Sequence, residues 1–361
     1  MDRSLFPVER PAEWALFKEG EYYLWKADMV DLSKEREHVK SLEQPKRYLL
    51  NFSTTAAAVD SVLFRPIIYS FLKDFQHPEL LACIGWQVTT IHTHHEMYCR
   101  LLHHHVNYEN EKVFFFDLVK TFPSLSLKSN WLRNNSSSAA ERVVCFASVS
   151  GIIGWSRFAT VLGVEGSNRM SGLRESYDKI IRDTLLQMEI SKCLYLSLED
   201  RLDDLRAKDI IQSAIDNEKK FARDALSDFY QAVGYTELDS YIQWCGDRVL
   251  RDLGYNCDPV MPSSFQWMLD ILPKRVPQAL PNYCPLIGFE LIILIFFEKF
   301  ARWEKEIVKH LRDKLRLSER RAAARTRMQR LFERRAAAGT RMQRLAEHRA
   351  LISTPRTTMT I

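Results

Sequence analysis

The stretch from Gly85 to Val106, GWQVTTIHTHHEMYCRLLHHHV, constrains the fold more than any other part of the chain. It contains no Gly or Pro after Gly85, so no residue in it favours breaking a helix. On a helix, His94 and Tyr98 lie four residues apart and share one face. If that face is buried, the pair is either a metal ligand beside a redox-active phenol or a hydrogen-bonded pair within a core. The neighbouring helices must decide between these two interpretations.

A second stripe of the same helix carries four side chains of metal-binding type. We call this set the histidine stripe; it comprises His92, His95, Glu96 and Cys99. A zinc ion needs four ligands in a tetrahedral array, and one helix face normally offers two. The consecutive residues 103–105 are also histidines, and on a helix they point in three directions. We therefore expect ordinary surface histidines here rather than a metal site.

Composition favours long helices and a reduced environment. The 361 residues are 46% hydrophobic, with only 12 Gly and 13 Pro. The seven cysteines form no CxxC pair, and no basic and apolar leader opens the chain. We expect a cytoplasmic protein without disulfides.

Apolar periodicity places the helices along the chain. An amphipathic helix is expected within 5–33, followed by helices at about 46–64, 85–106, 111–122, 142–162, 171–198, 206–233 and 237–254, and a short closing element at 265–272. The segment 142–162 is almost wholly apolar, which predicts one long helix in the middle of a bundle. Asp60 is the single carboxylate in an apolar helix, so it needs a buried partner.

Charge is distributed unevenly along the chain. Residues 298–361 hold 18 Lys and Arg against 7 Asp and Glu, a net charge of +11 in a chain whose total is +5. This tail contains a 14-residue repeat from Glu319 to Ala346, which predicts a solvated basic helix or disorder, with coiled-coil pairing or nucleic-acid binding as the alternative. We divide the chain into a bundle at 1–275, an apolar insertion of uncertain status at 276–297 and the basic tail at 298–361. The apolar run of the insertion is too short to span a membrane, so we expect no membrane attachment.

Seven sequence motifs occur along the chain in the order in which a known protein family carries them. They are LFPVERPAEWALFKEGEYYLWKADMVDLS, GWQ with HHEMY, KSNW, ERVVCFASVSGI, MSGLRESYDKIIRD, YIQWCGDRVLRDLGYN and FQWMLDIL. On these motifs, residues 5 to about 272 resemble the small subunit of class I ribonucleotide reductase. The resemblance implies an all-α, ferritin-like bundle in which carboxylates and Glu-x-x-His pairs hold two irons. In that family the irons and oxygen generate a tyrosyl radical, which passes to the large subunit.

The resemblance assigns six ligand positions, and only two of them carry the family's residue type. Asp60 and His94 match, whereas the other four positions hold Ile91, Ser150, Thr184 and Gln187. Two iron ions need several anionic oxygens to balance their charge, which these four side chains do not supply. We therefore expect iron to be absent or weakly bound.

Three further positions match the family's radical chemistry. Tyr98 stands at the radical tyrosine, and Trp25 and Asp183 stand, with His94, in the relay that leads to the subunit surface. Without an oxidant at the metal site, we expect no radical to form on Tyr98. We expect the Trp25, Asp183 and His94 set to act as a hydrogen-bonded network that stabilises the fold.

The function implied is a small subunit that supports deoxyribonucleotide synthesis as an iron-deficient partner of an intact small subunit. Such a protein forms a homodimer or heterodimer and associates with the large subunit. One alternative is an active radical-generating subunit with an atypical metal at Asp60 and His94. Another is a non-catalytic interaction protein that acts through its basic tail. The sequence leaves open whether this protein is itself an enzyme.

Overall fold

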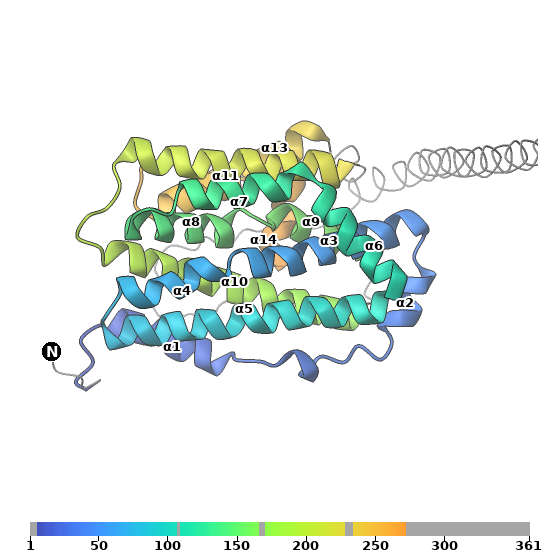
Figure 1. Ribbon diagram of the computed structural model, residues 1–361, viewed down its shortest axis with the longest axis horizontal. Helices are drawn as coiled ribbons and strands as arrows, with labels where there is room; N and C mark the ends of the chain where they lie inside the picture. Colours follow the sequence, from blue (N-terminus) through green and yellow to red (C-terminus); the bar gives the residue numbers. More distant parts are fainter. Residues whose placement is uncertain (1–5, 107–108, 166–169, 228–233, 272–361) are drawn as a thin grey trace, which may run out of the picture. The chain divides into compact units, whose positions relative to one another are not determined.

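The computed structural model describes residues 6–106, 109–165, 170–227 and 234–271 (Figure 1). All of them belong to the first of two compact units, which spans Met1–Ala301. The apolar insertion at 276–297, the basic tail and its 14-residue repeat lie outside the described residues.

Every described regular element is a helix, so the expected all-α class is confirmed. The elements are α1 (Pro11–Tyr22), η1 (Ala27–Met29), α2 (Glu35–Ser41), α3 (Gln44–Leu63), α4 (Arg65–Asp74), α5 (Pro78–His105), α6 (Glu109–Thr121), α7 (Pro123–Asn134), α8 (Ala139–Gly151), α9 (Trp155–Glu165), α10 (Ser171–Leu196), α11 (Asp204–Ala225), α13 (Tyr235–Asp252), η2 (Ser263–Phe265) and α14 (Gln266–Ile271). The long helices α5, α10, α11 and α13 run roughly along one direction (Figure 1).

Helix packing places α5 and α10 at the centre of the candidate site. Helix α5 packs against α1, α3, α4 and α10, while α10 also packs against α8. Helix α11 packs against α7, α8 and α13. The histidine-rich stretch therefore lies on a central helix of the bundle.

Local signals explain where several helices begin. Helices α1, α3, α4, α5 and α7 each carry Pro in the first two positions, where a missing N–H costs nothing. Helix α8 begins with a capping box: Ser138 accepts from the Glu141 backbone N–H, and the Glu141 carboxylate accepts from that of Ser138.

The long helix expected at 142–162 is wrong, because α8 ends at Gly151 and α9 begins at Trp155. Between them Gly154 has φ 95°, a conformation that glycine adopts without steric cost. The Trp155 indole N–H donates to the carbonyl of Ser150 at 2.8 Å and bridges the break. An apolar sequence did not reveal this interruption, because both helices are buried.

The first helix covers only part of the expected span 5–33. It ends at Tyr22, and Trp25 lies in the connection to η1. Tyr22 is 80% exposed, whereas Trp25 is 5% exposed. The chain leaves the helix so that Trp25 enters the core.

Two helical stretches are long and apolar enough to cross a membrane, Gln44–Asp74 and Ala139–Gly163. In their most apolar windows, 50% and 94% of the residues are buried inside the bundle. Their burial is consistent with core helices of this bundle. The six cysteines among the described residues are free thiols.

Candidate functional site

The six positions assigned to metal ligands are all buried, with exposed fractions between 2% and 9%. They lie on four helices: Asp60 on α3, Ile91 and His94 on α5, Ser150 on α8, and Thr184 and Gln187 on α10. Contacts join α3 to α5, α5 to α10 and α10 to α8. The site residues that the sequence indicated thus belong to helices that pack together in one interior.

Trp25, Asp183 and His94 form a continuous hydrogen-bonded network. The Trp25 indole N–H donates to Asp183 Oδ2 at 2.7 Å, and His94 Nε2 lies 3.0 Å from the same oxygen. The rings of Trp25 and His94 stack with centroids 6.2 Å apart. Arg182 donates to the other oxygen, Oδ1, at 3.3 Å and to the carbonyl of Tyr23 at 2.9 Å. The structure therefore brings together the three residues that sequence reasoning grouped.

Three of the remaining ligand positions hold uncharged polar side chains. Gln187 Nε2 donates to the Thr90 hydroxyl at 3.0 Å. The Thr184 hydroxyl donates to the carbonyl of Ile180, one turn earlier on α10, at 2.8 Å. Ser150 Oγ is buried without a hydrogen bond. None of these side chains is a carboxylate or an imidazole.

Asp60 is engaged by two cations. Lys128 Nζ donates to its Oδ2 oxygen at 2.7 Å, and Arg157 Nη1 forms an ion pair with the same oxygen at 2.8 Å. Burial disfavours the charged carboxylate, but the charges of Lys128 and Arg157 outweigh burial and lower the pKa of Asp60. The expectation that Asp60 needs a buried partner is confirmed.

A second carboxylate completes this group. Glu218 Oε2 lies 3.9 Å from Lys128 Nζ, while its Oε1 accepts from the Ser156 hydroxyl at 2.5 Å and from the Gly154 N–H at 3.1 Å. We call Asp60, Lys128, Arg157 and Glu218 the ion cluster.

Sequence reasoning missed three members of the ion cluster: Lys128, Arg157 and Glu218. One signal was available, because Arg157 is the single charged residue in the apolar run 143–163. A lone buried cation requires an anion, just as Asp60 required a cation. Lys128 is the first residue of the KSNW motif, but the charges of Lys128 and Glu218 do not stand out, because both residues lie among other charged and polar residues.

Tyr98 lies on α5 close to the ion cluster. Its side chain is 5% exposed, and its ring meets that of Tyr177 edge-on at 6.3 Å. Burial, reinforced by Tyr177, raises the pKa of Tyr98, and the nearby charge of Arg157 only partly offsets this. Tyr98 is therefore a neutral phenol at physiological pH.

The six assigned positions hold few of the donor groups that a di-iron centre uses. Only Asp60 and His94 among the six positions offer an anionic oxygen or an imidazole. The Oδ2 oxygen of Asp60 contacts two cations. Throughout the part of the chain that the structure describes, no three His, Cys, Asp or Glu side chains are grouped so that they could hold a metal ion.

Each member of the histidine stripe contacts a neighbour. The Tyr69 hydroxyl lies 2.7 Å from His92 Nε2, and the Ser61 hydroxyl lies 2.9 Å from His95 Nδ1. Cys99 Sγ is 3.8 Å from His95 Nε2. Glu96 lies 4.0 Å from the cation of Arg100. Burial, reinforced by the charge of Arg65, lowers the pKa of His92 and His95.

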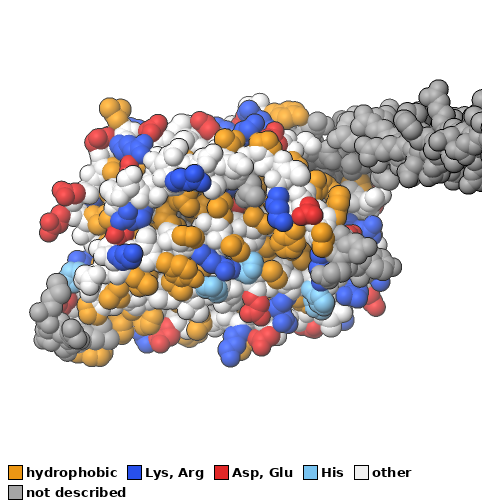
Figure 2. Space-filling model, viewed as in Figure 1, with side chains coloured by type: hydrophobic (Ala, Val, Ile, Leu, Met, Phe, Trp, Pro, Cys, Tyr) orange, Lys and Arg blue, Asp and Glu red, His pale blue; other side chains and the backbone are white. Residues whose placement is uncertain are grey.

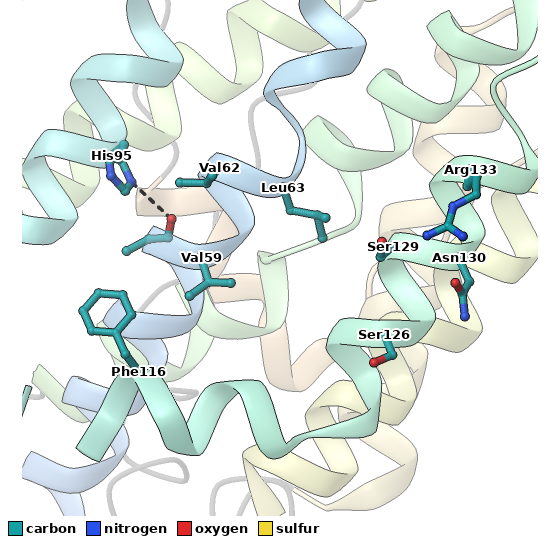
Figure 3. Close-up of a pocket in the computed structure, with 10 residues that line it drawn as sticks. Val59, Val62, Leu63, His95, Phe116, Ser126, Ser129, Asn130 and Arg133 are labelled. Atoms are coloured by element: carbon teal, nitrogen blue, oxygen red, sulfur yellow. Dashed lines mark hydrogen bonds between the residues drawn. The ribbon is translucent and has the colours of Figure 1, made fainter. Parts of the chain in front are cut away.

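A pocket of about 570 Å³ lies beside this stripe, between α3, α6 and α7 (Figure 3). Val59, Val62 and Phe116 line its apolar side, and Asn130 and Arg133 lie on its polar side. Orange apolar side chains and pale blue histidines share the surface on this face (Figure 2). The pocket contains none of the six predicted ligand positions, so it is separate from the candidate site.

Comparison with known proteins identifies the family. The family described as ribonucleotide reductase, small chain, matches residues 2–257. The ribonucleoside-diphosphate reductase small chain of Nicotiana tabacum is 31% identical over 268 residues, which cover 73% of this protein and 82% of the tobacco protein. The human ribonucleoside-diphosphate reductase subunit M2 is 28% identical over 272 residues, covering 74% of this protein and 70% of the human one.

Solved structures share the fold. The ribonucleotide reductase Rnr4 homodimer from Saccharomyces cerevisiae superposes with a TM-score of 0.66 at 22% identity, with 72% of this protein and 84% of the yeast protein covered. The dimanganese(II) NrdF of Streptococcus sanguinis gives a TM-score of 0.62 at 18% identity, covering 71% and 92%. The helical bundle, the order of its motifs and the match over residues 2–257 show that the protein belongs to the small-chain family of ribonucleotide reductase.

Proposed function

We propose that this protein supports deoxyribonucleotide synthesis as an iron-deficient small subunit that pairs with an intact small subunit in the cytoplasm. Membership of the family supports the role in deoxyribonucleotide synthesis. We infer the pairing from the chemistry of the site. A subunit that forms no radical supports ribonucleotide reduction by binding a subunit that forms one. Contact with the large subunit then occurs within the resulting assembly.

The proposal rests on the contacts that the carboxylate of Asp60 makes. It is the one carboxylate among the six ligand positions, and two protein cations contact its Oδ2 oxygen. Ile91, Ser150, Thr184 and Gln187 leave no other anionic oxygen at these positions. A pair of iron ions would lie in a site with far too little negative charge.

The first experiment measures iron and radical directly. The purified full-length protein is loaded with ferrous iron without oxygen, then exposed to oxygen beside an intact small subunit treated in the same way. We expect far less than two irons per molecule and no tyrosyl radical in the electron paramagnetic resonance spectrum. A stoichiometric di-iron absorption spectrum would contradict the proposal and favour the active subunit with an atypical site.

The second experiment identifies the partner. Affinity capture of the tagged protein from its native cells should recover an intact small subunit of ribonucleotide reductase. Adding this protein to that subunit should change the ribonucleotide reduction rate of the assembly containing the large subunit. Recovery of nucleic acid without any reductase subunit would instead support a non-catalytic protein that acts through residues 298–361.

A gain-of-function variant tests the ligand assignment. The changes Ile91→Glu, Ser150→Glu, Thr184→Glu and Gln187→His restore the family's ligand types. Because Lys128 and Arg157 remain against Asp60, we expect these four changes alone to restore little iron binding. The same four changes combined with Lys128→Met should bind more iron, measured by metal analysis. Equal iron binding with and without Lys128→Met would count against the role assigned to Asp60.

A further inference from the structure

The ion cluster joins four helices in the core. Asp60 comes from α3, Lys128 from α7, Arg157 from α9 and Glu218 from α11, with exposed fractions of 6%, 1%, 5% and 0%. Two carboxylates and two cations give the cluster a formal charge of zero. Buried charges are costly unless they are paired, so mutual pairing offsets part of the cost of burying these four groups.

The break between α8 and α9 positions the cluster. Gly154 donates its N–H to Glu218, and a Cβ atom at Gly154 would lie 2.8 Å from Arg157 Nη2. The ring of Phe221 lies 4.3 Å from Lys128 Nζ and 5.1 Å from Arg157 Cζ. An aromatic face attracts both cations in this dry environment. Backbone conformation and packing therefore both hold the cations beside Asp60.

We infer that Lys128 and Arg157 take the place of a metal cation at Asp60. Their ammonium and guanidinium groups supply the positive charge that balances the buried carboxylates, and they exclude divalent cations from Asp60. Both contact Oδ2, so a metal ion on this oxygen would have to displace one of them, and a metal ion on Oδ1 would lie beside both positive charges. This inference rests on the proposed iron-deficient function and adds that the core is stable without metal.

A double-mutant cycle on the full-length protein tests the charge balance. Lys128→Met should lower the melting temperature by roughly 10 °C, because it leaves two carboxylates with one cation. Asp60→Asn should also lower it. The double variant removes one charge of each sign, so it should be clearly more stable than the sum of the two single effects predicts. Additive effects would overturn the inference.

A matched exposed pair is the control for this cycle. Lys120 and Asp117 form an ion pair 3.2 Å long on α6, and both side chains are 65% exposed. The same cycle with Lys120→Met and Asp117→Asn should show almost no coupling. If Lys128→Met alone does not yield folded protein, the double variant should restore folded protein, and failure to do so would overturn the inference.

Metal dependence provides the second readout. The melting temperature of the unmodified protein should not change with a chelator or with added Mn²⁺. A rise with Mn²⁺ that disappears in Asp60→Asn would show that a metal reaches Asp60 and would overturn the inference. A protein that captures no intact small subunit, yet shows the coupling and no metal dependence, would refute the proposed partnership and leave the inference standing.

Discussion

Two buried polar networks lie in the same bundle and are stabilised in different ways. In the Trp25 network, the single carboxylate of Asp183 accepts hydrogen bonds from Trp25 and Arg182 and lies against His94. In the ion cluster, two carboxylates face two cations. The first network depends on hydrogen-bond acceptors, whereas the second depends on the balance of charge. The position assigned to a metal ligand in the second network, Asp60, contacts two protein cations, whereas Asp183 in the first network contacts hydrogen-bond donors and an imidazole.

Arg157→Met should lower the free energy of unfolding more than a substitution in the Trp25 network or at Glu35. It leaves Asp60 and Glu218 with only Lys128, so we expect the free energy of unfolding to fall by about 4 kcal/mol, measured by denaturant titration. Arg251→Met, on the surface of α13, is the control and should cost less than about 1 kcal/mol. An equally small loss for Arg157→Met would show that charge balance is not what stabilises the ion cluster.

Asp183→Ala should have an intermediate effect. It removes the acceptor for the Trp25 indole N–H and the partner of His94, and we expect a loss of about 3 kcal/mol. Asp183→Asn keeps one acceptor oxygen and should cost less. If Asp183→Asn cost as much as Asp183→Ala, the negative charge rather than the acceptor would stabilise the network, and the contrast with the ion cluster would disappear.

Glu35, a buried carboxylate outside both networks, gives the smallest effect and a test by pH. Glu35 Oε1 accepts from the N–H groups of Gly172 and Leu173 at 2.8 and 3.1 Å and so caps α10, while its Oε2 lies 4.0 Å from His105 Nε2. Burial raises the pKa of Glu35 more than these hydrogen bonds lower it. The folded state therefore binds this proton more tightly, and the associated stability is lost as pH rises from the ordinary Glu range through the raised pKa.

Glu35→Gln keeps an acceptor for the cap and removes this titration. We expect the stability difference between variant and parent to shift in favour of the variant as pH rises through that window, measured by thermal unfolding at several pH values. Burial lowers the pKa of His105 to about 3, so His105 costs stability as pH falls below the ordinary His range. His105 is present in both proteins, so its contribution largely cancels in the difference. A difference that is independent of pH would contradict the assignment to Glu35.

Much of the fold could be predicted because its signals are local. The helix starts at Pro78 and Pro123 fit the preference of Pro for the first turn, although the first of these helices was expected to begin at 85 and none was expected at 123–134. The interruption at Gly154 could not be predicted, since an almost wholly apolar run looks the same whether it forms one buried helix or two. Trp25, which lies after the end of the first helix, contacts Asp183, the residue with which the resemblance grouped it.

The sequence by itself determined the all-α class and the need of Asp60 for a partner, while its resemblance to the family grouped Trp25, Asp183 and His94. Only the tertiary structure identified that partner. Lys128 is 68 residues from Asp60, and no periodicity relates a helix-forming Lys on α7 to a carboxylate on α3. The physical reason is that hydrophobic patterning states which face of a helix is buried, whereas the pairing of buried charges depends on how four helices pack. The resemblance assigned Asp60 to a ligand position, and the packing showed which cations contact this carboxylate.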